Sequence, residues 1–260
     1  MRAIIDGDIL CYEVGHGVEW GKEEYGLPHF DYVAEFLDTR IQQILTDVNS
    51  NLPPVIYLSG QNNFRHDIAV SKPYKGNRKD VVRPFHYLNI RAHLQGAYEA
   101  IVVDGIEADD AMAIHQMQSC EETIICSRDK DMRQIPGWHY SWELYNQPSW
   151  GPCYVCDPGW IDLVKKSTWV LEGTGLAWFY AQLLTGDRGD NIPGLNKIGP
   201  IKAHGILKGF YDEEDLYTRV LQQYYCHRGK QAEEYMLEQG QLLWIVREMQ
   251  QDKPKIWELK

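Results

Sequence analysis

The sequence predicts an α/β fold with a mostly parallel central sheet flanked by helices. Two observations lead to this prediction: short apolar runs of the kind found in buried strands, and amphipathic helical patterns between several of them. This alternation is typical of parallel sheets, because a crossover helix must return the chain to the same edge. The expected strands are residues 2–5, 55–58, 100–103 and 123–126.

The clearest helical pattern lies between the first two expected strands. Val33, Leu37, Ile41 and Ile44 recur at the spacing of one helix face, and Asp31 precedes them as a plausible N-cap. We therefore expect a crossover helix that begins near residue 32.

Three later segments depart from this alternation. Residues 61–98 are polar, basic and aromatic without a clean period, and we expect an excursion above the sheet. Residues 137–160 are rich in Trp, Tyr, Pro and Gly, which favours a hairpin or an irregular lobe. Apolar positions beyond residue 211 predict closing helices. The length of 260 residues and the 44% hydrophobic content favour a single domain over residues 1–260.

The charge of the chain is unevenly distributed. A net charge of −11 argues against a polyanionic partner. However, residues 61–100 carry seven basic against three acidic side chains, and residues 188–210 carry four against one. An acidic protein with two basic segments can bind nucleic acid once metal ions neutralise its carboxylates.

The cysteines and the hydropathy pattern indicate the compartment. Six cysteines without a regular framework favour free thiols. Cys153 and Cys156 have zinc-knuckle spacing, but no second pair follows at zinc-ribbon distance, so ordinary structural cysteines are the favoured interpretation. No apolar run approaches the roughly 20 residues that span a bilayer, and no signal segment opens the chain. We expect a soluble, cytoplasmic protein with no membrane partner.

Carboxylates gather where the expected strands end and helices begin. Ligands of parallel sheets collect beyond the carboxyl ends of the strands, and hard cations prefer several oxygen ligands. Helix-dipole complementarity explains each acidic residue alone but not their common edge. We therefore expect a metal site formed by eight residues: Asp6, Glu107, Asp109, Asp110, Asp129, Asp131, Asp187 and Asp190.

The last two of these acids belong to a glycine-punctuated stretch, residues 187–200. Asp187 and Asp190 are three residues apart, close enough to bind one cation, and Gly194 and Gly199 bracket a hairpin before an expected helix. Backbone amides at such a turn can hold a phosphate. Chemistry and substrate binding are thus expected side by side.

Several ordered motifs resemble those of the 5′-nuclease superfamily, which includes phage 5′-to-3′ exonucleases, flap endonucleases and the 5′-nuclease domain of bacterial DNA polymerase I. The resemblance extends from Asp6 to about Leu207. It implies a PIN-like core with a helical arch at about residues 61–98 and a helix-hairpin-helix element at about residues 186–210. The motifs are Asp6-Gly, Phe64-Arg65, Tyr74-Lys75-Gly-Asn-Arg78, Glu107-Ala-Asp-Asp110, Ser127-Arg-Asp-Lys-Asp-Met132 and Gly186-Asp-Arg-Gly-Asp-Asn-Ile-Pro-Gly194.

The resemblance implies a metal-dependent phosphodiesterase that cuts DNA at or near a 5′ end with two Mg²⁺ or Mn²⁺ ions. By position, the first ion would take Asp6, Glu107, Asp109 and Asp110, and the second Asp129, Asp131, Asp187 and Asp190, some of them through water. Asp6, Asp109 and Asp129, with Lys75 and Arg78, are the expected catalytic residues. Asp8 occupies a less uniform position and is expected only to cap the following helix.

The same resemblance implies how DNA is held. Arg65, Tyr74, Lys75 and Arg78 match the arch, under which a single-stranded 5′ end passes and where Tyr74 could stack on a base. Lys197 and Lys202 would add phosphate contacts to the hairpin glycines, Gly194 and Gly199, and a K⁺ ion often sits there in the family. The implied partners are DNA with 5′ ends, flaps or nicks, RNA–DNA hybrids and replication proteins. A phage source, and hence the host cytoplasm, would suit a role in primer removal or DNA degradation.

One position departs from the family pattern. Many relatives end the second strand in an aspartate of the first metal cluster, whereas this chain has Ser59 followed by Gly60 and Gln61. Two alternatives therefore stay open: a structure-specific DNA-binding protein that has lost catalysis, and a PIN-type RNA nuclease, which would require neither arch nor hairpin.

Overall fold

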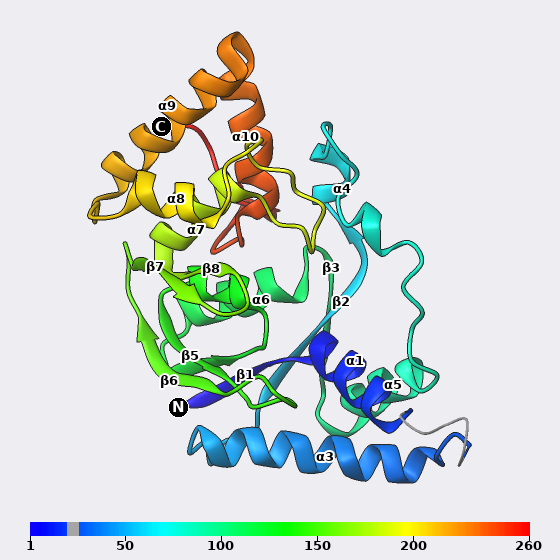
Figure 1. The fold of residues 1–260 in the computed structure, drawn as a ribbon. Helices are drawn as coiled ribbons and strands as arrows, with labels where there is room; N and C mark the ends of the chain where they lie inside the picture. The colour runs from blue at the N-terminus through cyan, green and yellow to red at the C-terminus, as the bar shows by residue number, and fades with distance from the viewer. Residues whose placement is uncertain (20–25) are drawn as a thin grey trace. The chain divides into compact units, whose positions relative to one another are not determined.

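The computed structural model describes residues 1–19 and 26–260 (Figure 1). These residues group into two compact units, and the single domain over residues 1–260 stays a prediction. Unit 1 comprises Met1–Asn62, Val81–Met132 and Gly137–Tyr154; unit 2 comprises Asn63–Asp80, Arg133–Pro136 and Val155–Lys260.

Unit 1 is built on a six-stranded sheet with the order β3-β2-β1-β4-β5-β6. β1 pairs in parallel with β2 and with β4, and β4 pairs in parallel with β5. The mostly parallel sheet and its four predicted strands are thus confirmed, and segment 137–160 adds β5 and β6 to the sheet. The strands are β1 (Arg2–Asp6), β2 (Val55–Asn63), β3 (Ile101–Gly105), β4 (Thr123–Cys126), β5 (Gly137–Ser141) and β6 (Trp150–Val155).

Apolar stripes of the unit 1 helices bury against this sheet. Helix α3 turns Leu37, Ile41 and Ile44 into the core, as their spacing predicts. Its N-cap is His29 and not Asp31, because the His29 ring accepts a hydrogen bond from the Asp31 amide, which places Asp31 in the first turn. The helices are α1 (Gly7–Val18), α3 (Phe30–Asp47), α5 (Tyr87–Ala97) and α6 (Ala108–Gln118).

Unit 2 is mainly helical. Helix α7 is buried along nearly its whole length and packs against α8, α9, α10 and the β7–β8 hairpin. Helices α9 and α10 confirm the closing helices predicted beyond residue 211. The elements are α4 (Arg65–Ile68), η1 (Gly76–Arg78), β7 (Trp160–Lys165), β8 (Trp169–Thr174), α7 (Gly175–Thr185), α8 (Pro200–Leu207), α9 (Glu213–Arg228), η3 (Gly229–Gln231), α10 (Ala232–Leu243), β9 (Met249–Gln250) and β10 (Lys253–Pro254); η2 (Lys130–Gln134) follows β4.

The segment 61–98 is more regular than its composition suggested. Strand β2 continues to Asn63, and Tyr87–Ala97 forms helix α5, which buries Ile90 and Leu94 against α1 and α3. These two apolar residues lie four apart, and the surrounding polar residues mask their period. Between β2 and α5, the helical turns are α4 and η1.

Two further expectations concern chemistry and membranes. All six cysteines are free, as predicted. Among the residues that the structure describes, no helix combines the length and apolar character needed to cross a bilayer.

Candidate active site

Asp6 lies at the end of β1, where the chain turns into α1. Its Oδ1 accepts a hydrogen bond from the Ile9 amide at 3.0 Å, so Asp6 caps α1, and Asp8 lies in the first turn instead of capping it. Its Oδ2 accepts from the Ser127 hydroxyl at 2.8 Å, and that hydroxyl accepts from the Asp129 amide at 3.0 Å. Strands β1 and β4 are neighbours, so their ends bring Asp6 and the Ser127 loop together.

The carboxylate of Asp6 is only 2% exposed, and its environment disfavours negative charge. Burial raises the pKa of Asp6 to about 7, with the neighbouring carboxylates of Asp8 and Asp129 adding to the rise. The Ile9 amide and the Ser127 hydroxyl oppose it. A cation bound here would offset both the burial and the mutual repulsion.

A second set of contacts joins Ser59, in the middle of β2, to the start of α6. The carboxylate of Asp8 accepts from the Ser59 amide and from Arg91 of α5, each at 2.9 Å. Arg91 also donates to the Ser59 carbonyl at 2.8 Å. The Ser59 hydroxyl accepts from the Ala108 amide at 2.9 Å. Ser59 therefore caps the first turn of α6, and no sequence pattern predicts that Arg91 joins it.

The acidic motif at the start of α6 is held by a capping box. The Glu107 side chain accepts from the backbone of Asp110, whose side chain accepts from the Glu107 amide at 3.1 Å. Asp110 is fully buried, whereas Glu107 and Asp109 are half-buried. These carboxylates lie at the positive end of the α6 helix dipole, which attracts negative charge.

Asp187 follows the end of α7 in unit 2. Its amide and carbonyl pair with the carbonyl and amide of Ile192 at 2.9 and 2.7 Å, which closes a tight loop. Its Oδ1 accepts from the Gly189 amide at 2.7 Å. The loop depends on two glycines with positive φ, because a Cβ on Gly194 would lie 2.2 Å from the Gly186 nitrogen.

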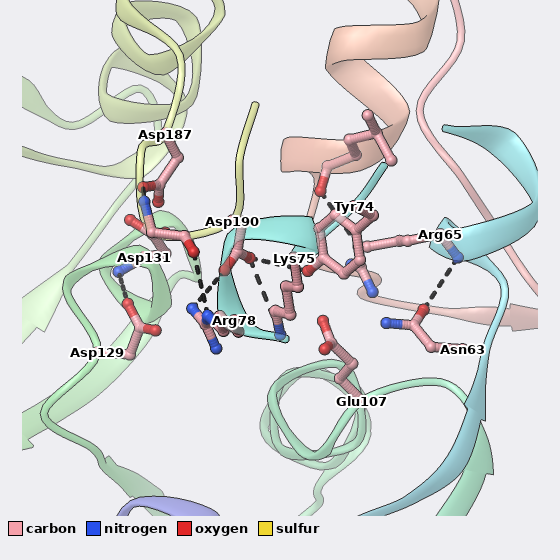
Figure 2. A network of polar contacts seen from close by, with 12 residues as sticks. Asn63, Arg65, Tyr74, Lys75, Arg78, Glu107, Asp129, Asp131, Asp187 and Asp190 are labelled. Carbon is pink, nitrogen blue, oxygen red and sulfur yellow. Dashed lines mark hydrogen bonds and ion pairs between the residues drawn. The ribbon is translucent and has the colours of Figure 1, made fainter. Parts of the chain in front are cut away.

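Asp190 lies on this loop and contacts the basic motif of residues 73–78 (Figure 2). Arg78 donates to its Oδ1 at 2.5 Å, and the Tyr74 hydroxyl donates to its Oδ2 at 2.8 Å. The Lys75 ammonium lies 3.9 Å from Oδ2. Three of these residues are predicted from the sequence to belong to one active site. They lie together within unit 2: Lys75, Arg78 and Asp190.

Two residues expected to contact DNA are buried in unit 2. Arg65 is 3% exposed and donates to the carbonyls of Leu242 at 3.2 Å and Trp244 at 2.6 Å, where α10 ends. Tyr74 is 4% exposed and gives its hydroxyl to Asp190. The polar groups of both side chains serve the fold of unit 2, and motif matching alone could not show this burial.

The hairpin of residues 192–199 borders a cavity of about 570 Å³, which Lys72, Arg188 and Arg228 also line. Its turn is supported by α10: the Gly194 amide donates to Gln239 at 3.1 Å, and the Tyr235 hydroxyl donates to the Gly194 carbonyl at 3.2 Å. Gly194 therefore shapes the turn, and its amide is already occupied.

The rest of the hairpin is more open. Gly199 precedes α8, a Cβ on it would meet nothing within 4 Å, and Lys197 and Lys202 are exposed. These three residues stay available as the predicted phosphate contacts. Sequence reasoning missed Tyr235 and Gln239, which lie 41 and 45 residues away from Gly194 in the chain.

No family model matches the chain. A 5′-3′ exonuclease of Buchnera aphidicola subsp. Schizaphis graminum is 31% identical over 188 residues, or 69% of this chain and 61% of that protein. Flap endonuclease Xni of Shewanella baltica is 27% identical over 60% of this chain and 58% of that protein. The chain thus spans about three-fifths of the length of each of these curated relatives.

Among solved structures, the bacteriophage T5 D15 flap endonuclease, described as a complex with DNA and metal ions, matches over 92% of this chain and 83% of its own. The TM-score is 0.54 at 16% sequence identity, so this likeness concerns the fold. The curated relatives resemble this chain in sequence. The T5 protein resembles it in fold, with the same central sheet flanked by helices. The chain is thus similar in sequence to 5′-3′ exonucleases and flap endonucleases, and similar in fold to the T5 flap endonuclease.

Proposed function

We propose that the protein is a 5′-to-3′ exonuclease and structure-specific flap endonuclease that hydrolyses DNA phosphodiester bonds. The observation that carries this proposal is the contact of Asp6 with the Ser127–Asp131 loop, where a buried carboxylate with a raised pKa lies beside other acids. The activities named for the sequence relatives support it.

The donor set fits divalent metal ions. Across residues 1–19 and 26–260, no group of three or more His, Cys, Asp or Glu side chains is already arranged around an ion position. The acids nevertheless offer the oxygen ligands that Mg²⁺ and Mn²⁺ prefer, and the raised pKa of Asp6 shows that its charge is poorly balanced by the protein alone. The residues that would hold the ions, some of them through water, are Asp6, Glu107, Asp109, Asp110, Asp129, Asp131, Asp187 and Asp190.

Two such ions supply an activated water and Lewis acidity when bound. The side chains of the protein do the rest. Lys75 and Arg78 place positive charge beside the phosphate whose charge grows in the transition state. Lys197 and Lys202 contact the duplex backbone and fix its position without reading sequence. Binding of K⁺ at the hairpin belongs to the same proposal.

The proposed substrates are DNA with 5′ ends, flaps or nicks, and RNA–DNA hybrids, which suits primer removal during replication or DNA degradation. The test is cleavage of a 5′-labelled flap duplex and a blunt duplex, each with Mg²⁺ and with EDTA, and with product lengths resolved. Short 5′ products that require Mg²⁺ are expected. Tight binding without products would favour an inactive DNA-binding protein, and cleavage restricted to an RNA duplex would favour a PIN-type RNA nuclease.

A further inference from the structure

Ser59 joins the starts of two helices in unit 1. Its amide donates at 2.9 Å to the carboxylate of Asp8, in the first turn of α1. Its hydroxyl accepts at 2.9 Å from the amide of Ala108, the first residue of α6. The N-caps of these two helices are Asp6 and Glu107, which are both expected metal ligands. A shift of Ser59 would therefore move the starts of both helices.

Arg91 of α5 holds Ser59 in place. Its Nη2 donates to the Ser59 carbonyl at 2.8 Å, and its Nη1 donates to Asp8 Oδ1 at 2.9 Å. The other oxygen of Asp8 accepts from the Ser59 amide, so the three residues close a ring of hydrogen bonds. The side chain of Arg91 is 14% exposed and that of Asp8 is 26% exposed. The ion pair is therefore partly shielded from water and stronger than a pair on the open surface.

The donors of Arg91 serve contacts inside unit 1. Besides the two bonds above, Nη1 lies 3.5 Å from the Tyr87 hydroxyl, and the guanidinium lies 5.8 Å from the centre of the Tyr87 ring. A guanidinium fixed in this way acts on its surroundings through Asp8 and Ser59. Lysine could not replace it, because an ammonium group lacks the planar fork that reaches both partners.

Strand β2 adds no charge of its own at this point. A Cβ on Gly60 would lie 2.6 Å from the Val103 carbonyl oxygen, so the backbone of β3 leaves no room for a side chain there. The next amide, of Gln61, donates to Asp104 at 2.9 Å. Residues 59–61 thus contribute hydrogen bonds and no carboxylate, and the acids at the two helix starts must be placed by other contacts.

We propose that Arg91 is a positioning residue for the acidic centre of unit 1: with Asp8 it fixes Ser59, and Ser59 fixes the start of α6, which carries the acids of residues 107–110. The part of this inference that concerns metal rests on the proposed nuclease function. The path from Arg91 to Ala108 can be tested without DNA and without cleavage.

The first test measures Mn²⁺ binding to the metal-free protein by titration calorimetry. Arg91→Lys keeps the positive charge but cannot bridge Asp8 and the Ser59 carbonyl, so a change in affinity reports geometry and not charge. The affinity for at least one ion should fall by about tenfold. Arg83→Lys changes an exposed arginine ahead of α5 and is the matched control, with wild-type affinity expected. Wild-type affinity in Arg91→Lys would overturn the inference.

Arg91→Gln sharpens this test, because charge and position predict opposite signs. Loss of a positive charge near the acids would by itself strengthen Mn²⁺ binding by about twofold to fivefold. Loss of position weakens it. Net weakening in Arg91→Gln is expected, and binding tighter than that of the wild type would show that Arg91 acts only through its charge.

The second test asks whether Arg91 acts through Ser59. Ser59→Ala removes the hydroxyl bond to Ala108 and leaves the Ser59 carbonyl for Arg91. It should weaken Mn²⁺ binding less than Arg91→Lys does. The double variant should lose less than the product of the two single losses, because both changes act on the same helix start. Independent losses would contradict the path through Ser59.

The third test measures the start of α6 by hydrogen exchange with mass spectrometry. In Arg91→Lys and in Ser59→Ala, the peptide that contains residues 107–110 should exchange severalfold faster, while peptides of α3 keep wild-type rates. Circular dichroism checks that each variant folds, and Ser59→Ala, the milder change, decides the matter if Arg91→Lys does not. Unchanged exchange at the start of α6 would contradict the positioning role, whether or not the protein binds Mn²⁺.

Kinetics on the flap duplex separate positioning from DNA contact. Arg91→Lys should lower kcat by about tenfold and leave KM within about twofold, because its donors are occupied inside unit 1. A loss confined to KM would mean that Arg91 contacts DNA and would overturn the inference. A wild-type protein that fails to cleave DNA would refute the nuclease proposal, while the exchange and Mn²⁺ results would still decide the role of Arg91.

Discussion

The two acidic regions of this protein balance their charge in opposite ways. In unit 1, Asp6 is buried, accepts hydrogen bonds from neutral donors and lies near Asp8 and Asp129. In unit 2, Asp190 is paired with Arg78 and approached by Lys75. The first arrangement disfavours the anion of Asp6, and an added cation would favour it, whereas the second carries its own cation.

Acidic residues of one motif set therefore lie in different electrostatic surroundings. A carboxylate whose pKa is raised stores unfavourable electrostatic energy that ion binding can release, so it is suited to a metal. A carboxylate that is paired with arginine already has a cation beside it.

Removing a unit 1 carboxylate should be the most damaging change to catalysis. Asp109→Asn is expected to lower kcat/KM for flap cleavage by about 10³-fold, because it removes an oxygen ligand from the proposed metal site while leaving the capping box of α6 intact. Circular dichroism should remain that of the wild type. The control is Glu35→Gln, which changes an exposed acid on α3. Full activity of purified Asp109→Asn would contradict a catalytic role for the unit 1 carboxylates.

The raised pKa of Asp6 predicts how stability depends on pH in EDTA. Between about pH 4 and pH 7 the folded protein keeps a proton on Asp6 that the unfolded chain has released, so stability should fall as pH rises through that window and level off above it. At pH 8 the ionised group would cost up to roughly 4 kcal/mol.

Asp6→Asn isolates this contribution because it keeps an oxygen that can cap α1. Urea unfolding at several pH values should show the variant gaining on the wild type from pH 4 to pH 7, and Mg²⁺ should reduce that gain at pH 8. If the stability difference between Asp6→Asn and the wild type did not change with pH, the charge of Asp6 would be as well balanced as that of Asp190. The contrast between the two regions would then be wrong.

The unit 2 loop should depend on backbone geometry more than on charge. Gly194→Ala is expected to cost about 2–4 kcal/mol, because φ is +60° and a Cβ would meet the backbone of residues 185 and 186. Gly199→Ala should cost less than about 0.5 kcal/mol, since the space around it is open and its φ is −101°. Chemical denaturation of the two variants measures the difference in their free energies of unfolding. Similar losses of stability would contradict the tight Gly186–Gly194 contact.

The parts of the molecule that could be predicted from sequence are those set by local pattern. Period and apolar content predicted the β1, β2, β3 and β4 strands and helix α3, and strand ends predicted where Asp6 and Asp129 would meet. The partners of Asp190 and Gly194 could not be predicted, because Arg78 and Gln239 reach them from distant parts of the chain. The burial of Arg65 was hidden for the same reason: its carbonyl partners lie at residues 242 and 244.

The smallest expected effect concerns the outward-facing charge of unit 2. Lys202 is exposed in the first turn of α8, beside the open hairpin residue Gly199, and it is the kind of lysine that contacts a phosphate without fixing the fold. Lys202→Gln should weaken duplex binding by roughly twofold to fivefold, equally across sequences, and should reduce the slope of log affinity against log salt by about 1. Lys166→Gln, on the turn between β7 and β8, is the control and should leave that slope unchanged. This test measures binding and not cleavage, so its result does not depend on the carboxylate predictions. An unchanged slope for Lys202→Gln would contradict a contact between this lysine and DNA. Unit 2 would then act on DNA through Lys75 and Arg78.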